Sequence, residues 1–251
     1  MSENAVSQDS NSDKGRAVFA STHWSVVVEA GQSDSTKASE AMAQLCRTYW
    51  YPLYAYVRRK GYSPHDAQDL TQEFFAKLLA GNYVGAADRR KGKFRSFLLG
   101  ALEHFLGKEW RRTHAEKRGA GQTPISLDEL DAEDRYLLEP ADELTPASLF
   151  DRRWAATLLE TALKRLEAEC QEGNKADFFL KARDLLSGHG AEASYAQLAT
   201  SLSMSEGAFK VAIHRLRQRY GELIRLEILE TLTDPDDVDQ ELQYLLAAVR
   251  E

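Results

Sequence analysis

Apolar residues along this chain recur at intervals of three or four, and this spacing restricts the fold more than any other feature. The same interval places side chains on one face of an α-helix, whereas a half-buried strand alternates at every second residue. No segment of the chain shows convincing alternation. The sequence therefore predicts an all-α fold.

Changes in charge and clusters of turn-forming residues predict how the helices are grouped. With 251 residues, 43% of them hydrophobic, the chain is long enough for two modest domains. Between them, the stretch SLDELDAEDRYLLEPADE carries eight acids against one base. The predicted parts are a disordered tail (1–20), a first helical domain (21–118), an acidic, flexible linker (119–146), a second helical domain (147–233) and a C-terminal helix (234–251).

Several classes of protein are disfavoured by composition. No run approaches the eighteen or so apolar residues of a membrane helix, and the polar start lacks the hydrophobic region of a signal peptide. Two separated cysteines and six scattered histidines suggest neither a zinc cluster nor a catalytic nucleophile. We expect a cytoplasmic, non-enzymatic protein that has no metal, no cofactor and no membrane contact.

The net charge of −7 conceals strongly basic segments. Residues 88–118 hold ten bases and four acids, a local charge of ten minus four, or +6. A second basic cluster comprises Lys210, Arg215, Arg217 and Arg219. Because nucleic-acid binding relies on Lys and Arg, these segments keep a nucleic-acid partner open despite the acidic average.

An amphipathic helix with an unusual acidic face is predicted over residues 63–79, SPHDAQDLTQEFFAKLL. Ser63 is a suitable N-cap, and Ala67, Leu70, Phe74 and Leu78 form an apolar stripe. A row of acids follows the same spacing on another face. It consists of Asp66, Asp69 and Glu73. This row is compatible with a solvated surface, with a divalent-metal site that needs further ligands, or with a docking face for a basic partner.

A helix-turn-helix is predicted over residues 194–223, SYAQLATSLSMSEGAFKVAIHRLRQRYGEL. Ser194 and Ser205 can cap a short and a longer helix on either side of the SMS turn. In the longer helix, Glu206, Lys210, His214 and Arg217 share an outward face suited to the major groove. A surface helix with a few bases is the alternative.

Together, the two motifs resemble conserved regions of the extracytoplasmic-function sigma factors of bacterial RNA polymerase. DAQDLTQEFFAKLL is similar to the second region and SYAQLATSLSMSEGAFKVAIHRLR to the fourth. The resemblance covers about residues 38–117 and 178–226, in the family's order.

The resemblance implies an all-α protein in which a domain like sigma region 2 docks on core polymerase and melts the promoter, while one like region 4 reads an upstream element. Docking would use Asp66, Asp69, Gln72 and Glu73. DNA binding would use Arg89, Arg90, Lys93, Phe94, Arg95, His104, Lys108, Arg111, Arg112, Ser205, Glu206, Lys210, His214, Arg215 and Arg217. Phe94, flanked by two bases, is the expected stacking residue.

Some positions depart from the family pattern. Gln68 replaces a usual acid of the docking motif, which suggests a face one charge short, and His104 stands where Asn is common. Thr71 lies in the same helix, so a Ser/Thr kinase that phosphorylates it would restore negative charge. Ser203 occupies a turn position where Gly is frequent, at a cost if φ is positive.

The sequence thus predicts an alternative sigma factor whose partners are core RNA polymerase and promoter DNA, with a regulatory protein or kinase as a further partner. The alternative is a stand-alone helix-turn-helix regulator of transcription. A metal-dependent nuclease built on the acidic row is a more distant alternative.

Overall fold

The computed structural model describes residues 36–80, 93–115, 127–138, 144–186 and 194–250. All regular structure within these ranges is helical, and no strand occurs in them, which confirms the all-α prediction. Among the helices described, none combines the length and apolar character that crossing a membrane requires.

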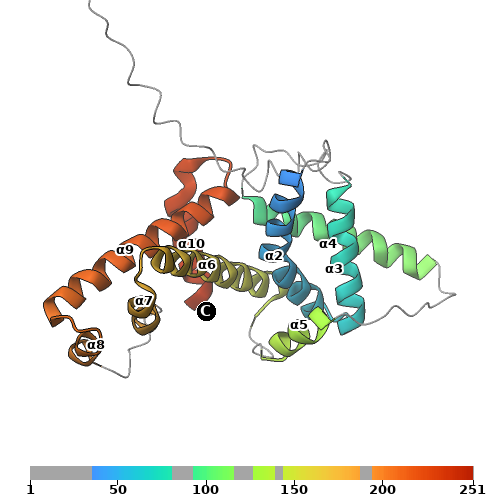
Figure 1. Cartoon of the computed structure of the whole chain (residues 1–251). Coiled ribbons are helices and arrows are strands. Elements are labelled where there is room, and N and C mark those ends of the chain that lie inside the picture. Colours follow the sequence, from blue (N-terminus) through green and yellow to red (C-terminus); the bar gives the residue numbers. More distant parts are fainter. Residues whose placement is uncertain (1–35, 81–92, 116–126, 139–143, 187–193, 251) are drawn as a thin grey trace, which may run out of the picture.

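The chain order is a series of α-helices with two short 3₁₀ helices, labelled η (Figure 1). They are α2 (Thr36–Arg59), α3 (Pro64–Leu79), α4 (Phe94–Ala115), α5 (Leu127–Leu137), α6 (Pro146–Glu172), α7 (Ala176–Ala182), η3 (Arg183–Leu185), α8 (Tyr195–Ser201), α9 (Glu206–Thr231), η4 (Pro235–Asp237) and α10 (Val238–Arg250).

Hydroxyl side chains fix where four of these helices begin. Ser63, Thr145, Ser194 and Ser205 each accept a hydrogen bond from the backbone N–H three residues later, at the starts of α3, α6, α8 and α9. Such caps satisfy amides that have no partner within the helix. The three caps predicted from the sequence, all serines, are confirmed.

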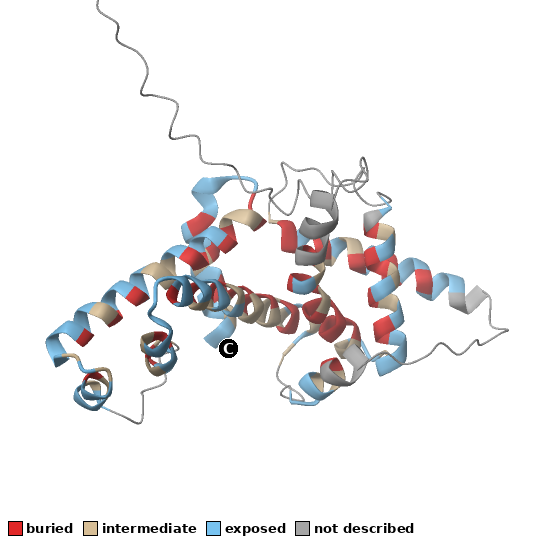
Figure 2. Ribbon diagram, in the orientation of Figure 1, coloured by how far each residue is buried: buried red, intermediate tan, exposed pale blue. Residues whose placement is uncertain are grey.

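The long helix α6 connects the two parts of the molecule (Figure 1). It packs against α2, where Trp154 is fully buried, and against α9, where the Tyr220 hydroxyl donates to the Leu159 carbonyl at 3.0 Å. The buried side chains of α2, α3, α4, α6 and α9 belong to one apolar cluster, visible as the red faces of the helices in Figure 2. The parts predicted as two domains therefore share a core along α6.

Part of the segment predicted as an acidic linker forms the helix α5, residues 127–137. This helix contacts α2 and α3. Its Glu133 accepts from Arg58 Nε at 2.9 Å and Nη2 at 2.7 Å, and from the Tyr54 hydroxyl. The hydrogen bonds from Arg58 lower the pKa of Glu133, against the effect of burial. Residues 1–35, including the predicted tail, lie outside the described ranges.

The core along α6 predicts that replacing one tryptophan lowers stability strongly, whereas replacing another has little effect. Trp154→Ala removes a fully buried ring and is expected to lower the free energy of unfolding by about 3–5 kcal/mol. Trp110→Ala, the matched control, removes a ring that is 54% exposed and should change it by less than about 1 kcal/mol. Urea unfolding followed by circular dichroism measures both, and equal effects would contradict the placement of α6.

Candidate functional site

The acidic row of α3 lies on the exposed side of that helix, as the sequence predicts. Asp66 and Asp69 are exposed, Glu73 is partly exposed, and the apolar stripe on the other side is buried or packed against the core. Asp69 pairs with His65 at 3.2 Å, and Glu73 with Lys77 at 2.7 Å. These are i, i+4 pairs on one helix, which contribute little stability and exchange readily with other charges.

Two other residues of α3 do not lie where the sequence reasoning placed them. Gln68 is buried, so the inference that it leaves the docking face one charge short is wrong. The Thr71 side chain has no exposed surface, and its hydroxyl donates to the Ala67 carbonyl at 2.7 Å. A kinase cannot reach this hydroxyl while α3 is packed, so the structure argues against phosphorylation of Thr71. Gln72, in contrast, is exposed beside the acidic row.

Lys77 connects the acidic row to the basic helix α4. Its Nζ lies 2.7 Å from Glu73 Oε1 and 2.8 Å from Glu109 Oε1, and 4.8 Å from the centre of the Phe105 ring. Burial alone would raise the pKa of Glu109, but the hydrogen bonds and charges of Lys77 and Arg112 lower it below its ordinary value. Glu109 is therefore a buried, paired carboxylate that holds α3 and α4 together.

At the start of α4, the structure contradicts two predicted DNA contacts. Phe94 is fully buried, with its ring edge-on to Tyr49 at 5.4 Å, so it offers no exposed ring to a base. Arg95 is also buried and makes ion pairs with Asp151 and Glu241, both at 2.7 Å. Neither side chain is available to nucleic acid in this conformation.

The exposed face of α4 retains a basic surface further along the helix. His104, Lys108, Arg111 and Arg112 are all exposed. Between them lies Trp110, an aromatic side chain exposed to 54%, which the sequence reasoning did not include among the DNA-binding residues. Exposed cations beside an aromatic ring suit single-stranded nucleic acid, because phosphates take the charges and bases stack on the ring. The predicted contacts Arg89 and Arg90 lie outside the described residues.

The helix-turn-helix predicted from the sequence is present in α8 and α9. Ser203 in the turn has a φ of 54°, so the cost that the sequence made conditional on a positive φ does apply at this residue. Phe209 on the inner side of α9 is fully buried, edge-on to the rings of Phe178 and Tyr195 at 5.8 and 5.7 Å. These aromatic contacts fix the orientation of α9 relative to α7 and α8.

The outer face of α9 carries most, though not all, of the side chains predicted there. Glu206, Lys210 and His214 are exposed near the N-terminal end of the helix, and Lys210 pairs with Glu206 at 2.6 Å. Arg217 is exposed too, but its Nη2 donates to the Leu185 carbonyl at 3.0 Å and to the Tyr195 hydroxyl at 3.4 Å. The outward positions suited to reading base edges are thus those of Glu206, Lys210 and His214, whereas Ser205 serves as the N-cap.

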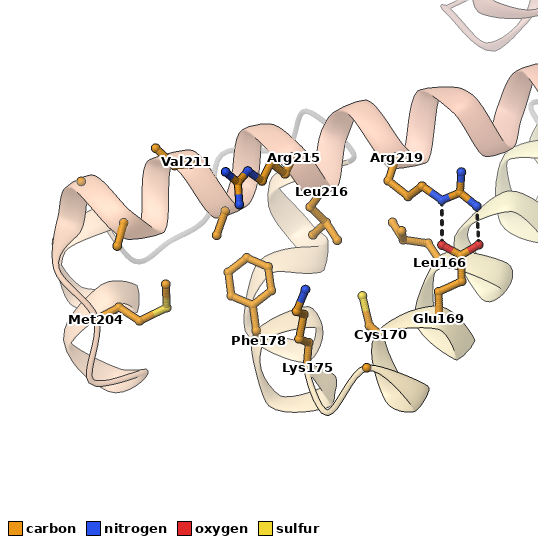
Figure 3. A pocket seen from close by; sticks show the side chains of 14 residues that line it. Leu166, Glu169, Cys170, Lys175, Phe178, Met204, Val211, Arg215, Leu216 and Arg219 are labelled. Atoms are coloured by element: carbon orange, nitrogen blue, oxygen red, sulfur yellow. Dashed lines mark hydrogen bonds and ion pairs between the residues drawn. The ribbon is translucent and has the colours of Figure 1, made fainter.

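A groove of about 770 Å³ runs between α9 and the helices α6 and α7 (Figure 3). Apolar walls come from Leu166, Cys170, Phe178 and Leu216, among others. Arg215 lines the groove and does not share the outward face of α9. At one end, Arg219 closes a two-point ion pair with Glu169 at 2.7 and 2.8 Å, drawn as dashed lines in Figure 3.

The part of the chain that the structure describes contains no group of three or more His, Cys, Asp or Glu side chains arranged to hold a metal ion. Within the described residues, the acids of α3 are thus not part of such a group.

Comparison of the chain with protein-family models, with curated proteins and with solved structures finds no match. The resemblance of the two motifs to sigma factors consequently stays a prediction from sequence.

The geometry of α9 separates two basic side chains that the sequence alone treats alike. Lys210→Ala should weaken duplex binding by about 1–3 kcal/mol and relax the preference at one base position, because Lys210 points outward. Arg217→Ala should instead loosen α9 from η3 and α8, and so lower thermal stability with a smaller and sequence-independent effect on binding.

Both variants are tested by selecting bound duplexes from a randomised pool and sequencing them. A relaxed base preference in Arg217→Ala, with no change in Lys210→Ala, would reverse the assignment.

Proposed function

We propose that this protein is an alternative sigma factor, which binds core RNA polymerase and directs it to promoters in the cytoplasm. One observation carries the proposal: the same chain presents an exposed acidic row on α3 and, further along, a capped helix-turn-helix with exposed base-reading positions on α9. The first surface suits a basic protein partner and the second suits duplex DNA. A sigma factor needs both.

Each surface has its own task in this proposal. The acids of α3, together with exposed Gln72, dock on the polymerase. The exposed bases of α4 and Trp110 bind DNA as the strands separate, since cations hold phosphates while an aromatic ring receives an unstacked base. Glu206, Lys210 and His214 on α9 read an upstream element. In this assignment Trp110 takes the stacking role that the buried Phe94 cannot perform.

A stand-alone regulator of transcription is the second candidate. It requires only the helix-turn-helix, whose caps and aromatic packing are well formed. This candidate gives the acidic row of α3 no task. The two candidates differ in one measurable property, which is binding to core polymerase in the absence of DNA.

The polymerase contact is tested by removing charge from the acidic row. The double variant Asp69→Asn with Glu73→Gln should bind purified core polymerase at least tenfold more weakly, because two charge pairs across the interface are lost. As a matched control, Glu160→Gln with Glu172→Gln removes two charges from exposed positions on α6 and should bind like the wild type.

Transcription provides the decisive readout. Core polymerase plus this protein should start transcripts at defined positions on genomic DNA fragments, and the acidic-row variant should lose them. If the wild-type protein neither binds core polymerase nor yields such transcripts, yet selects a specific duplex sequence, the stand-alone regulator is the correct function.

A further inference from the structure

Helix α10 lies outside the two regions that resemble sigma factors, yet it makes the most deeply buried ionic contact of the basic helix α4. Glu241, in the first turn of α10, has no exposed surface. Its carboxylate faces Lys93, just before α4, and Arg95, in the first turn of α4. A segment 146 residues further along the chain thus neutralises two cations of the predicted DNA-binding surface.

The Arg95 guanidinium has carboxylate and aromatic partners, and its side chain is only 8% exposed. Nε donates to Glu241 Oε1 and Nη1 to Asp151 Oδ1, each at 2.7 Å. The Tyr244 ring lies 4.0 Å from the guanidinium carbon and the Trp154 ring 5.1 Å from it. The Tyr244 hydroxyl in turn donates to Asp151. Residues of α6 and α10 therefore bury most of Arg95.

Lys93 is held by the same helix. Its Nζ forms an ion pair with Glu241 Oε2 and lies 5.5 Å from the centre of the Tyr244 ring. Both cations thus have the partners that a phosphate group would otherwise supply, namely anionic oxygens at hydrogen-bonding distance.

We propose that α10 is an autoinhibitory latch, in which Glu241 occupies Lys93 and Arg95 and withholds them from DNA until α10 detaches. The inference rests on the proposed function only in assigning these two cations to DNA. In the closed state the N-terminal end of α4 is covered and neutralised. In the open state Lys93, which follows the helical spacing of His104 and Arg111, joins their basic surface, while Arg95 loses one of its two carboxylate partners and becomes more accessible at the end of α4.

The energetics favour a reversible contact. Besides Glu241, α10 buries Val238 and Leu245 and packs Leu242 and Ala248 against the core, while Leu246 and Val249 are exposed. Few large apolar side chains therefore hold the helix, and its contact with the start of α4 is ionic. Because burying charges costs several kcal/mol, the pairs recover little more than this cost. DNA phosphates offer the same cations an equivalent partner, so opening the latch on DNA exchanges one set of ion pairs for another.

Removing the charge of Glu241 tests the latch in the full-length protein. Glu241→Gln should detach α10, seen as faster hydrogen exchange of its backbone amides. It should also raise affinity for a labelled duplex of mixed sequence. The slope of log affinity against log salt should steepen by about 1 to 2, since each newly contacted phosphate contributes roughly 0.9.

Asp239→Asn is the matched control. It removes one negative charge from the same turn of α10, but from an exposed side chain that pairs with Arg225 and does not touch α4. A general charge effect on DNA binding would appear in both variants, whereas the latch predicts a steeper slope for Glu241→Gln alone. Tyr244→Ala, which removes the ring beside Arg95 and Lys93, should act in the same direction if Glu241→Gln fails to fold.

Two results would overturn the latch. The first is faster exchange in α10 with no gain in DNA affinity or salt slope, because the released cations would then have no role in binding. The second is unchanged exchange in both the Glu241→Gln and Tyr244→Ala proteins, because α10 would then be held by other contacts. These assays contain no polymerase, so a sigma function that fails for lack of polymerase binding leaves their outcome unaffected.

Discussion

The arrangement of this fold depends on one buried cation. Arg95 lies in the first turn of α4 and forms ion pairs with Asp151 of α6 and Glu241 of α10. The rings of Trp154 and Tyr244 lie beside its guanidinium group. Removing one partner of a buried pair costs more than the pair contributes, because the remaining charge has no compensation. The positions of α4, α6 and α10 are thus coupled: none of them moves without exposing or rehydrating a charge that the other two hold.

Local features of the sequence predicted the helices well. Caps at Ser63, Ser194 and Ser205 depend on the backbone three residues later, and amphipathic faces depend on neighbours three or four residues away. Such signals are complete within a single turn or two of helix. The helical spacing also predicts correctly that the Thr71 side chain is buried. It lies four residues after Ala67 and three before Phe74, and so belongs to their buried stripe and not to the acidic row.

Other features had no local signal. Phe94 and Arg95 stand in a basic stretch that is typical of an exposed DNA-binding surface. Phe94 is instead buried against Tyr49 of α2, and Arg95 is buried against α6 and α10, whose Glu241 is 146 residues away. The groove beneath α9 likewise combines walls from three helices. Trp110 had no clear local signal either, because it lies four residues after the buried Leu106, an interval that favours the same face, yet its side chain is exposed.

The buried contacts of α4 also determine how the proposed partner on α3 would influence the proposed DNA binding. A ligand shifts a conformational equilibrium only by the difference between its affinities for the two states. Docking at the acidic row therefore favours the open latch only if the contact between α3 and α4 differs between the open and closed states. Lys77 supplies such a contact, since it pairs with Glu73 of the row and with Glu109 of α4. If a cationic partner pairs with Glu73, Lys77 then pairs with Glu109 alone. This stabilises the contact between α3 and α4 at Glu109, while Glu241 contacts α4 near its N-terminal end. One route between the proposed docking surface and the latch therefore runs along α4, from Glu109 to Arg95.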